Sequence, residues 1–405
     1  MLGCCLGLFR RCYDLPEEVL VEIFSWLPTD SLIRFKCVSK SWYALISFLI
    51  KNPEFVSKHL RNIDNKISSS TCLVFCCAGY GQRRHPELKF LRRNMFQSLT
   101  IFHDDDNERD FGNYVPQHFD LPLLPARDQH ASNVVGIHCD GIICQADYHG
   151  NVILCNPAIK EWRTLPKPRL DDGCLATKGV GFGYDPRAND YKVVRFGCER
   201  IPRVGQVDYS KTKAEVYSMG TDSWREIGIH LKFDRFLVRA QKFFSRGVFY
   251  WSMWAPTYMV ISFHMSDELF HSMTLPNDLV VTQGEQIIPT VTVWNESVAL
   301  FLYHAKIGVA KSFEVWVMDD YYVGIKGTCS WIRKLVVGPL VDIATPLAFL
   351  KNDEFLMEAT DGSLILYDLR RQVLRKRIQA VSRLRCWDFS YVKSLVSVQG
   401  GSQSR

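Results

Sequence analysis

The chain has 405 residues, with 49 basic and 43 acidic side chains and a formal net charge of +6 at pH 7. Hydrophobic residues make up 47% of the sequence and charged residues 23%, which supplies folded cores and excludes a long disordered or fibrous chain. The small charge excess does not require a nucleic acid as partner. No run of about 18 apolar residues occurs, so the sequence predicts no membrane-spanning helix.

The cysteines and the N-terminus indicate a cellular compartment. Fourteen cysteines are scattered along the chain without a Cys-x-x-Cys pair, and we expect them to be reduced thiols in a cytoplasmic protein, with the nucleus as a second compartment. Residues 1–12 are predicted to be an N-terminal extension. Within it, Cys4 and Cys5 stand near Arg10 and Arg11, a combination that leaves reversible lipidation open.

The next residues place apolar side chains at helical spacing. A first helix is predicted within 14–28, with Pro16 at its start and Pro28 at its end, a second follows Pro28, and a third follows the capping residue Ser39. Three helices this short cannot bury all of their apolar faces by themselves. We therefore expect either a partner or the rest of the chain to cover the excess.

From Cys72 onward, short runs of Val, Ile, Phe, Tyr and Trp alternate with Gly, Pro, Asn and Asp clusters, which is typical of an all-β domain. Segment 81–129 is the least regular and is expected to hold loops around poorly patterned strands. The predicted strands are 151–157, 191–197, 213–219, 247–253, 259–265, 312–318 and 363–369.

A unit of strand, turn and strand recurs five times at intervals of about 50 residues, a period typical of propeller blades. A Trp or Phe after each turn is expected to pack between blades. We therefore predict an α+β chain, with a small three-helix unit followed by a large all-β domain, a kelch-like β-propeller. A β-sandwich with irregular hairpins is the alternative. The anchors of the five units are Leu154, Val216, Ile261, Val315 and Leu366.

The sequence offers no catalytic, metal or cofactor site, and we expect none. His138, Cys139, Cys144 and His149 come closest to metal-ligand spacing, but a hairpin with alternating side chains explains them better. The glycine-rich run at 179–186 lacks the spacing of a dinucleotide-binding loop or a P-loop and is predicted to be a tight turn. The basic run at 370–377 is predicted to be an exposed hairpin edge, and a localisation signal is the alternative.

Residues 14–46, DLPEEVLVEIFSWLPTDSLIRFKCVSKSWYALI, resemble an F-box, and we place that domain at 13–55. Residues 70–400 resemble the F-box-associated domain of plants. The motifs DGSLILYDL (361–369) and YVKSLVSV (391–398) are similar to those of S-locus F-box proteins. The other motifs that carry the resemblance are CDGIIC (139–144), LCNPAIKEWRTLP (154–166), GFGYDPRANDYKVVR (181–195), AEVYSMGTDSWREI (214–227) and EVWVMDDY (314–321).

This resemblance implies a non-catalytic substrate-recognition subunit of an SCF-type cullin-RING ubiquitin ligase. Its F-box would bind a Skp-type adaptor, which connects to the cullin and the RING protein. Its β-domain would bind the target, a style S-RNase in the self-incompatibility of pollen. The implied adaptor contacts are Leu15, Pro16, Val19, Leu20, Ile23, Leu27, Pro28, Leu32, Cys37, Val38 and Trp42.

Two other functions stay open. The first is the same receptor with an unrelated plant target, and the second is an oxidase of propeller fold with a copper site. If the target is a basic ribonuclease, the acidic segments 104–110 and 171–172 are expected to steer it electrostatically.

Overall fold

Four helices precede the strands. The first three confirm the sequence-based prediction, and the hydroxyl of Ser39 accepts the Trp42 N–H at 3.1 Å as the cap of α3. The fourth helix, α4, extends the helical part to Lys66 and was not predicted. The computed structural model describes residues 15–66, 70–78, 94–102, 117–119, 134–147, 150–170, 175–200, 207–231, 237–255, 257–276, 287–304, 309–319, 330–350, 353–378 and 389–399. The helices are α1 (Glu17–Ser25), α2 (Thr29–Phe35), α3 (Lys40–Leu49) and α4 (Pro53–Lys66).

In the described part of the chain, the strands form six antiparallel sheets of four strands each. The first sheet comprises β4 (Val134–Cys139), β5 (Ile142–Ala146), β6 (Val152–Asn156) and β7 (Glu161–Thr164). The second comprises β8 (Leu175–Asp185), β9 (Asp190–Arg200), β10 (Val207–Ser218) and β11 (Ser223–Ile227). The third comprises β12 (Leu237–Ser245), β13 (Val248–Trp254), β14 (Tyr258–His264) and β15 (Leu269–Thr274). The fourth comprises β16 (Ile287–Trp294), β17 (Ser297–His304), β18 (Lys311–Asp319) and β19 (Ser330–Leu340). The fifth comprises β20 (Ile343–Phe349), β21 (Glu354–Ala359), β22 (Leu364–Asp368) and β23 (Val373–Ile378). The closing sheet comprises β1 (Ser70–Ala78), β2 (Asn94–Phe102), β3 (Gln117–Phe119) and β24 (Phe389–Ser390).

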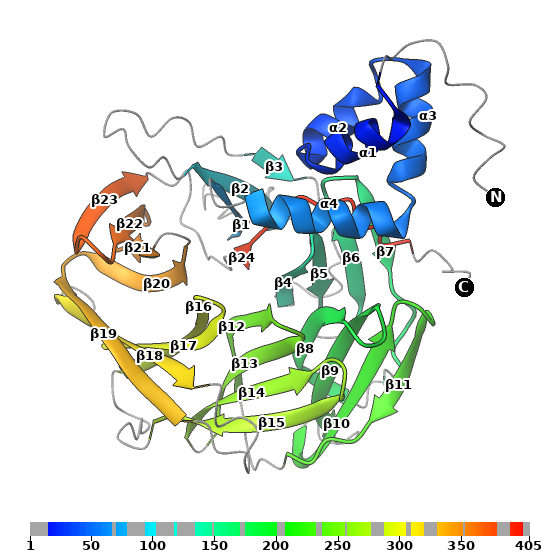
Figure 1. The fold of residues 1–405 in the computed structure, drawn as a ribbon. Coiled ribbons are helices and arrows are strands. Elements are labelled where there is room, and N and C mark those ends of the chain that lie inside the picture. The colour runs from blue at the N-terminus through cyan, green and yellow to red at the C-terminus, as the bar shows by residue number, and fades with distance from the viewer. Residues whose placement is uncertain are drawn as a thin grey trace, which may run out of the picture.

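These sheets stand side by side in a ring (Figure 1). The C-terminal strand β24 pairs with β1, with Leu73 opposite Ser390 and Val74 opposite Phe389, so the two ends of the β-domain meet in one sheet. The predicted β-propeller is confirmed, and the alternative of a two-sheet sandwich is wrong. Closure matters physically because every sheet then has a neighbour on both faces, which buries the apolar residues of the ring.

The predicted internal repeat corresponds to real blades. Each of its five anchors lies on the third strand of a sheet, from β6 to β22. All seven strands predicted from the sequence are present. The repeat missed the closing sheet, because two of its strands, β2 and β3, lie in the irregular segment 81–129 and β24 comes from the far end of the chain.

The glycine-rich run is a strand, and the predicted tight turn at 179–186 is therefore wrong. Residues 179–185 belong to β8, which pairs along its length with β9. A Cβ atom added at Gly179 would stand 2.3 Å from the ring of Phe196, and one at Gly181 would stand 2.6 Å from the ring of Trp251. The glycines therefore leave room for aromatic side chains that pack directly on the strand.

The aromatic residues after the turns pack against the preceding sheet in three of the units. The indole of Trp224 donates to the Pro166 carbonyl at 2.8 Å, and that of Trp331 donates to the Thr274 carbonyl at 2.9 Å. Phe270 packs against Phe196 with ring centroids 5.6 Å apart. For Trp162 the expectation is wrong, because its side chain on the outer strand β7 is 58% exposed.

The basic run at 370–377 covers a turn and β23, the edge strand of the fifth sheet, as predicted. Three of its arginines bind carboxylates of the same sheet. Arg370 reaches Asp353 at 2.6 Å, Arg375 reaches Glu354 at 2.5 Å, and Arg377 reaches Asp361 at 2.6 Å. These pairs give the basic residues a structural use within the blade.

Lys242 provides a test of the ring interior that depends on pH. Burial lowers the pKa of Lys242 to about 8, below the value of about 10.4 for an unfolded lysine. Between these values the unfolded chain binds more protons, so the stability that this residue contributes rises with pH, and its penalty is fully present below pH 8. We expect Lys242→Met to be more stable than the wild type at pH 7, with an advantage that shrinks from pH 8 to pH 10. Urea unfolding of both proteins across this range measures the difference, and a difference independent of pH would contradict the prediction.

Candidate adaptor-binding surface

The inner faces of the N-terminal helices form a core of their own. Phe24 of α1 is 1% exposed and Ile46 of α3 is fully buried. Two residues from outside the three predicted helices complete this core, namely Phe55 of α4 and Leu395 near the C-terminus. The shortage of partners that the sequence predicted for three short helices is therefore met partly from within the chain.

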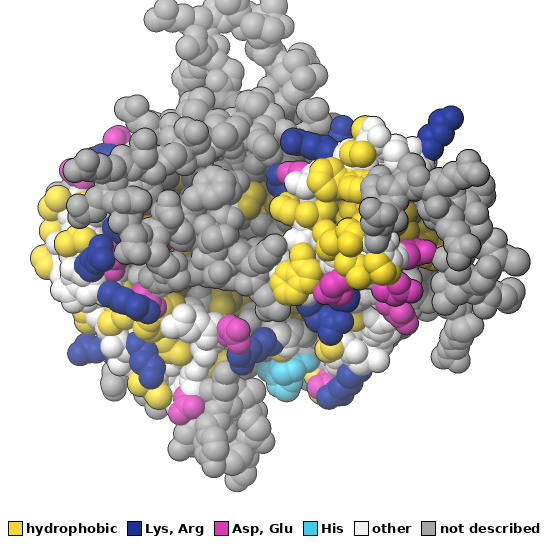
Figure 2. All heavy atoms as spheres, turned by 45° about the horizontal axis from the view of Figure 1, so that its top comes forward, with side chains coloured by type: hydrophobic (Ala, Val, Ile, Leu, Met, Phe, Trp, Pro, Cys, Tyr) yellow, Lys and Arg dark blue, Asp and Glu magenta, His cyan; other side chains and the backbone are white. Residues whose placement is uncertain are grey.

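The opposite face of α1 is apolar and open to solvent. Leu15, Val19 and Ile23 are 49%, 41% and 44% exposed and follow one another at helical spacing. Trp26 continues the row and is 39% exposed, with its indole donating to Glu22 at 2.9 Å. We call these four residues the α1 stripe. Figure 2 shows apolar side chains gathered over the helical unit, and a contiguous patch of this kind is typical of a protein-binding surface.

The structure separates the predicted adaptor contacts into a half-buried group, an exposed group and one buried residue, Leu32. Leu20, Leu27 and Trp42 are half-buried, and Trp42 lies with its ring centroid 5.1 Å from that of Phe24 and 5.3 Å from that of Phe35. The exposed group is Leu15, Pro16, Val19, Ile23, Pro28, Cys37 and Val38.

Leu32 requires a correction. Its side chain is fully buried among Phe24, Ile46 and Leu49, so it stabilises the helical unit and is not available for direct contact with a partner. Its place in the apolar pattern of α2 is the same for both roles, and the sequence could not separate them.

Three exposed apolar residues of the helical unit were not predicted as contacts. Trp26 is one, and Tyr43 and Phe48 of α3 are 60% and 56% exposed. For Trp26 a signal existed, because it follows Ile23 by three residues and so extends the same helical face.

Helix α4 joins the helical unit to the β-domain, and it lies between the two in Figure 1. The His59 ring approaches the Leu27 carbonyl at 2.9 Å, and Asn62 donates to the Ser25 hydroxyl at 2.9 Å. Burial lowers the pKa of His59, which keeps the ring neutral in this contact. Val56 and Leu60 pack on the core of the propeller. The helix therefore contacts the helical unit and the β-domain at once.

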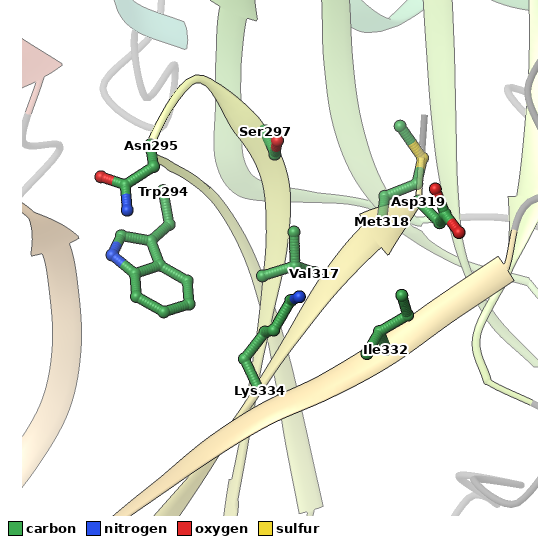
Figure 3. Close-up of a pocket in the computed structure, with 8 residues that line it drawn as sticks. All are labelled: Trp294, Asn295, Ser297, Val317, Met318, Asp319, Ile332 and Lys334. Atoms are coloured by element: carbon green, nitrogen blue, oxygen red, sulfur yellow. The ribbon is translucent and has the colours of Figure 1, made fainter. Parts of the chain in front are cut away.

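A half-open pocket of about 540 Å³ lies at one end of the fourth sheet (Figure 3). Trp294 forms one wall and stacks on Phe349 of the fifth sheet, with ring centroids 5.1 Å apart. The remaining lining combines apolar, polar and oppositely charged side chains, which suits a segment of a protein partner. Those side chains belong to Asn295, Ser297, Val317, Met318, Asp319, Ile332 and Lys334.

The His and Cys residues that came closest to metal-ligand spacing have structural roles where the structure describes them. Gly141 donates its N–H to the Nε2 atom of His138 at 2.9 Å, and burial lowers the pKa of His138 to about 3. Cys139 and Cys144 are buried, and burial raises the pKa of both thiols. His149 lies outside the described residues. No group of three or more potential ligands occurs in the described ranges.

Comparison with known proteins assigns both parts of the chain. Residues 12–53 match the F-box domain family, and residues 115–398 match the F-box associated beta propeller domain family. The chain belongs to the F-box proteins with an associated β-propeller. It is 30% identical to an F-box/kelch-repeat protein of Arabidopsis thaliana over 370 residues, which covers 88% of each chain. It is 25% identical to a putative F-box protein of the same plant over 381 residues, covering 84% of this chain and 89% of the relative.

The two family matches imply different binding partners for the helical unit and the propeller. An F-box implies binding to a Skp-type adaptor, and the propeller of such a protein implies binding to a protein target. Among the residues that the structure describes, no helix is long and apolar enough to cross a membrane.

Proposed function

We propose that this F-box protein is the substrate-recognition subunit of an SCF-type cullin-RING ubiquitin ligase in the cytoplasm. The observation that carries the proposal is the α1 stripe, an apolar row on a helix whose other face is already packed. A partner that covers such a row stabilises the complex by about 25 cal/mol for each Å² of apolar surface removed from water. A Skp-type adaptor is the partner that an F-box implies. The chain would supply no reacting group and would raise the local concentration of target lysines near a charged ubiquitin-conjugating enzyme.

For the target we propose a secreted style S-RNase, on the similarity of residues 361–369 and 391–398 to S-locus F-box motifs. One observation favours the alternative, an unrelated plant protein. Residues 391–398 are largely buried and hold the F-box against the propeller, so this motif is explained by a structural use. The acidic segments 104–110 and 171–172, which would steer a basic ribonuclease, lie outside the described residues. Cys4 and Cys5, the candidate lipidation sites, also lie outside the described residues.

Co-purification of the full chain from pollen, followed by mass spectrometry, tests both levels of the proposal. We expect a Skp-type adaptor and a cullin, together with a style ribonuclease. Recovery of the adaptor and cullin with a different target would overturn the ribonuclease and keep the ligase. Absence of any adaptor would overturn the ligase itself.

The double variant Leu15→Ala with Pro16→Ala should weaken adaptor binding about tenfold, because it removes the first apolar contact of the α1 stripe while leaving the helix interior intact. Calorimetric titration of the purified adaptor measures the change, and thermal unfolding of the propeller serves as the control. Binding at wild-type strength by a folded variant would show that this end of the stripe is outside the interface.

A further inference from the structure

We call residues 389–399 the strap. It begins with β24, which closes the ring, and its later residues form a network of contacts with the first sheet. The side-chain amide of Asn156 donates to the Val396 carbonyl at 2.8 Å and to the Ser394 carbonyl at 3.1 Å, and Asn156 is fully buried. The Ser394 hydroxyl donates to the Asp140 carbonyl at 2.5 Å. Glu161 accepts from the Ser397 hydroxyl at 2.6 Å.

The close approach of the strap to the first sheet depends on one glycine. Gly141 has φ of +84°, and a Cβ atom there would stand 2.3 Å from the Ser394 hydroxyl oxygen. Two contacts of Tyr391 also hold the start of the strap. Tyr391 donates its N–H to the Cys72 carbonyl at 2.7 Å, and its ring packs edge-on against His138 at 5.3 Å between centroids.

The same segment also binds the F-box. Thr29, at the start of α2, donates its hydroxyl to the Lys393 carbonyl at 2.7 Å, and the Lys393 ammonium pairs with Asp30 at 2.5 Å. Leu395 is 1% exposed and belongs to the core of the F-box helices. The following buried residues, Val396 and Val398, belong instead to the core of the propeller.

Successive side chains of the strap therefore enter two different cores. Because Leu395 and Val396 are adjacent in the chain, the F-box core and the propeller core are linked through a single peptide bond, as well as through α4. Rotation of the F-box on the propeller would have to withdraw Leu395 or break the backbone contacts of Asn156. Each loss exposes a fully buried group, and the two together oppose independent motion of the domains.

We propose that the strap fixes the orientation of the F-box on the propeller, with Leu395 as the positioning residue. The consequence for the ligase rests on the proposed function. A target bound to the propeller would be held at one distance and angle from the adaptor, so that only lysines within a limited zone would reach the ubiquitin-conjugating enzyme.

Hydrogen exchange on the free full chain tests the strap without any partner. In Leu395→Ala we expect amides of α1 to α3 to exchange at least tenfold faster than in the wild type, and β12 to β15 to keep their protection. Val398→Ala is the matched control, because it removes a buried strap side chain that belongs to the core of the propeller and not to the core of the F-box helices. It should leave the F-box amides unchanged. Equal protection of α1 to α3 in Leu395→Ala and wild type would overturn the proposal.

A second readout reports positioning. In a reconstituted ligase with adaptor, cullin and RING protein, ubiquitin attached to this chain itself is mapped by mass spectrometry. We expect Leu395→Ala to spread modification over at least twice as many lysines, and Val398→Ala to keep the wild-type pattern. An unchanged pattern in Leu395→Ala would overturn the positioning role. Failure of the adaptor to bind would overturn the proposed function and leave the exchange result standing.

Discussion

Replacement of Glu215 by Ala is expected to lower the free energy of unfolding by about 3–5 kcal/mol, because it leaves a buried guanidinium without its partner. Glu215 of β10 is fully buried and pairs with Arg195 of β9, which is 1% exposed. Its second carboxylate oxygen accepts the N–H groups of Arg169 and Leu170 at 3.0 and 3.3 Å. One carboxylate therefore joins the second sheet to the segment that leads into it from the first.

The guanidinium of Arg195 is closely packed by its neighbours. Gly150 has φ of +89°, and a Cβ atom there would lie 1.6 Å from a guanidinium nitrogen of Arg195. The guanidinium also lies over the ring of Trp224, at 5.9 Å from the centroid. The guanidinium is thus packed as well as paired, which prevents it from turning out to solvent when the carboxylate is removed.

Urea unfolding gives the measurement, and the double variant Arg195→Met with Glu215→Leu gives the control. Removing both charges should recover part of the loss, because no isolated buried charge then remains. The recovery is incomplete, since the two backbone N–H groups stay without their acceptor. A loss below about 1 kcal/mol for Glu215→Ala would mean that water reaches Arg195 and replaces the carboxylate.

Replacement of Ile23 by Arg should weaken binding of a Skp-type adaptor at least 100-fold, which corresponds to about 2.7 kcal/mol or more. Ile23 lies in the middle of the α1 stripe, where a partner that covers the stripe would have to bury the new charge without an ion pair. The F-box itself should stay folded, because the side chain at this position is 44% exposed.

Two further variants separate this effect from others. Val341→Arg places the same charge at an apolar residue of the propeller that is 69% exposed, and it should leave adaptor binding unchanged. Leu32→Ala removes a fully buried residue of the F-box core, so it should reduce binding by unfolding the helices, and excess adaptor should restore it. Tight binding of the adaptor by Ile23→Arg would exclude the α1 stripe as the interface. The amount bound is measured by titration calorimetry together with circular dichroism of the free chain.

Much of this architecture follows from patterns that lie within single segments. The helices α1 to α3 are bounded by Pro16, Pro28 and Ser39, whose effects on the backbone are local. The blades repeat a strand, a turn and a strand, and the anchors from Leu154 to Leu366 fall on equivalent strands for that reason. The α1 stripe is likewise visible as helical spacing in a short window.

Other features depend on contacts between residues that are far apart in the chain, and the sequence does not encode them in any one segment. Strand β24 joins β1 across more than three hundred residues, and Leu395 fills the core of helices near the opposite end of the chain. The glycines of β8 are explained only by the aromatic rings that pack on them, such as Phe196 and Trp251.

Helices α1 to α3, five of the blades and the apolar face of α1 could be predicted from the sequence, because each depends on the local periodicity of the chain. Which apolar residues remain on the surface depends on how the helices and the strap pack together. Leu32 and Ile23 carry equivalent signals in the sequence, yet Leu32 is buried in a core that also contains residues of α3 and the strap, while Ile23 stays open to solvent. Burial is a property of the assembled neighbours, and these include residues from the opposite end of the chain.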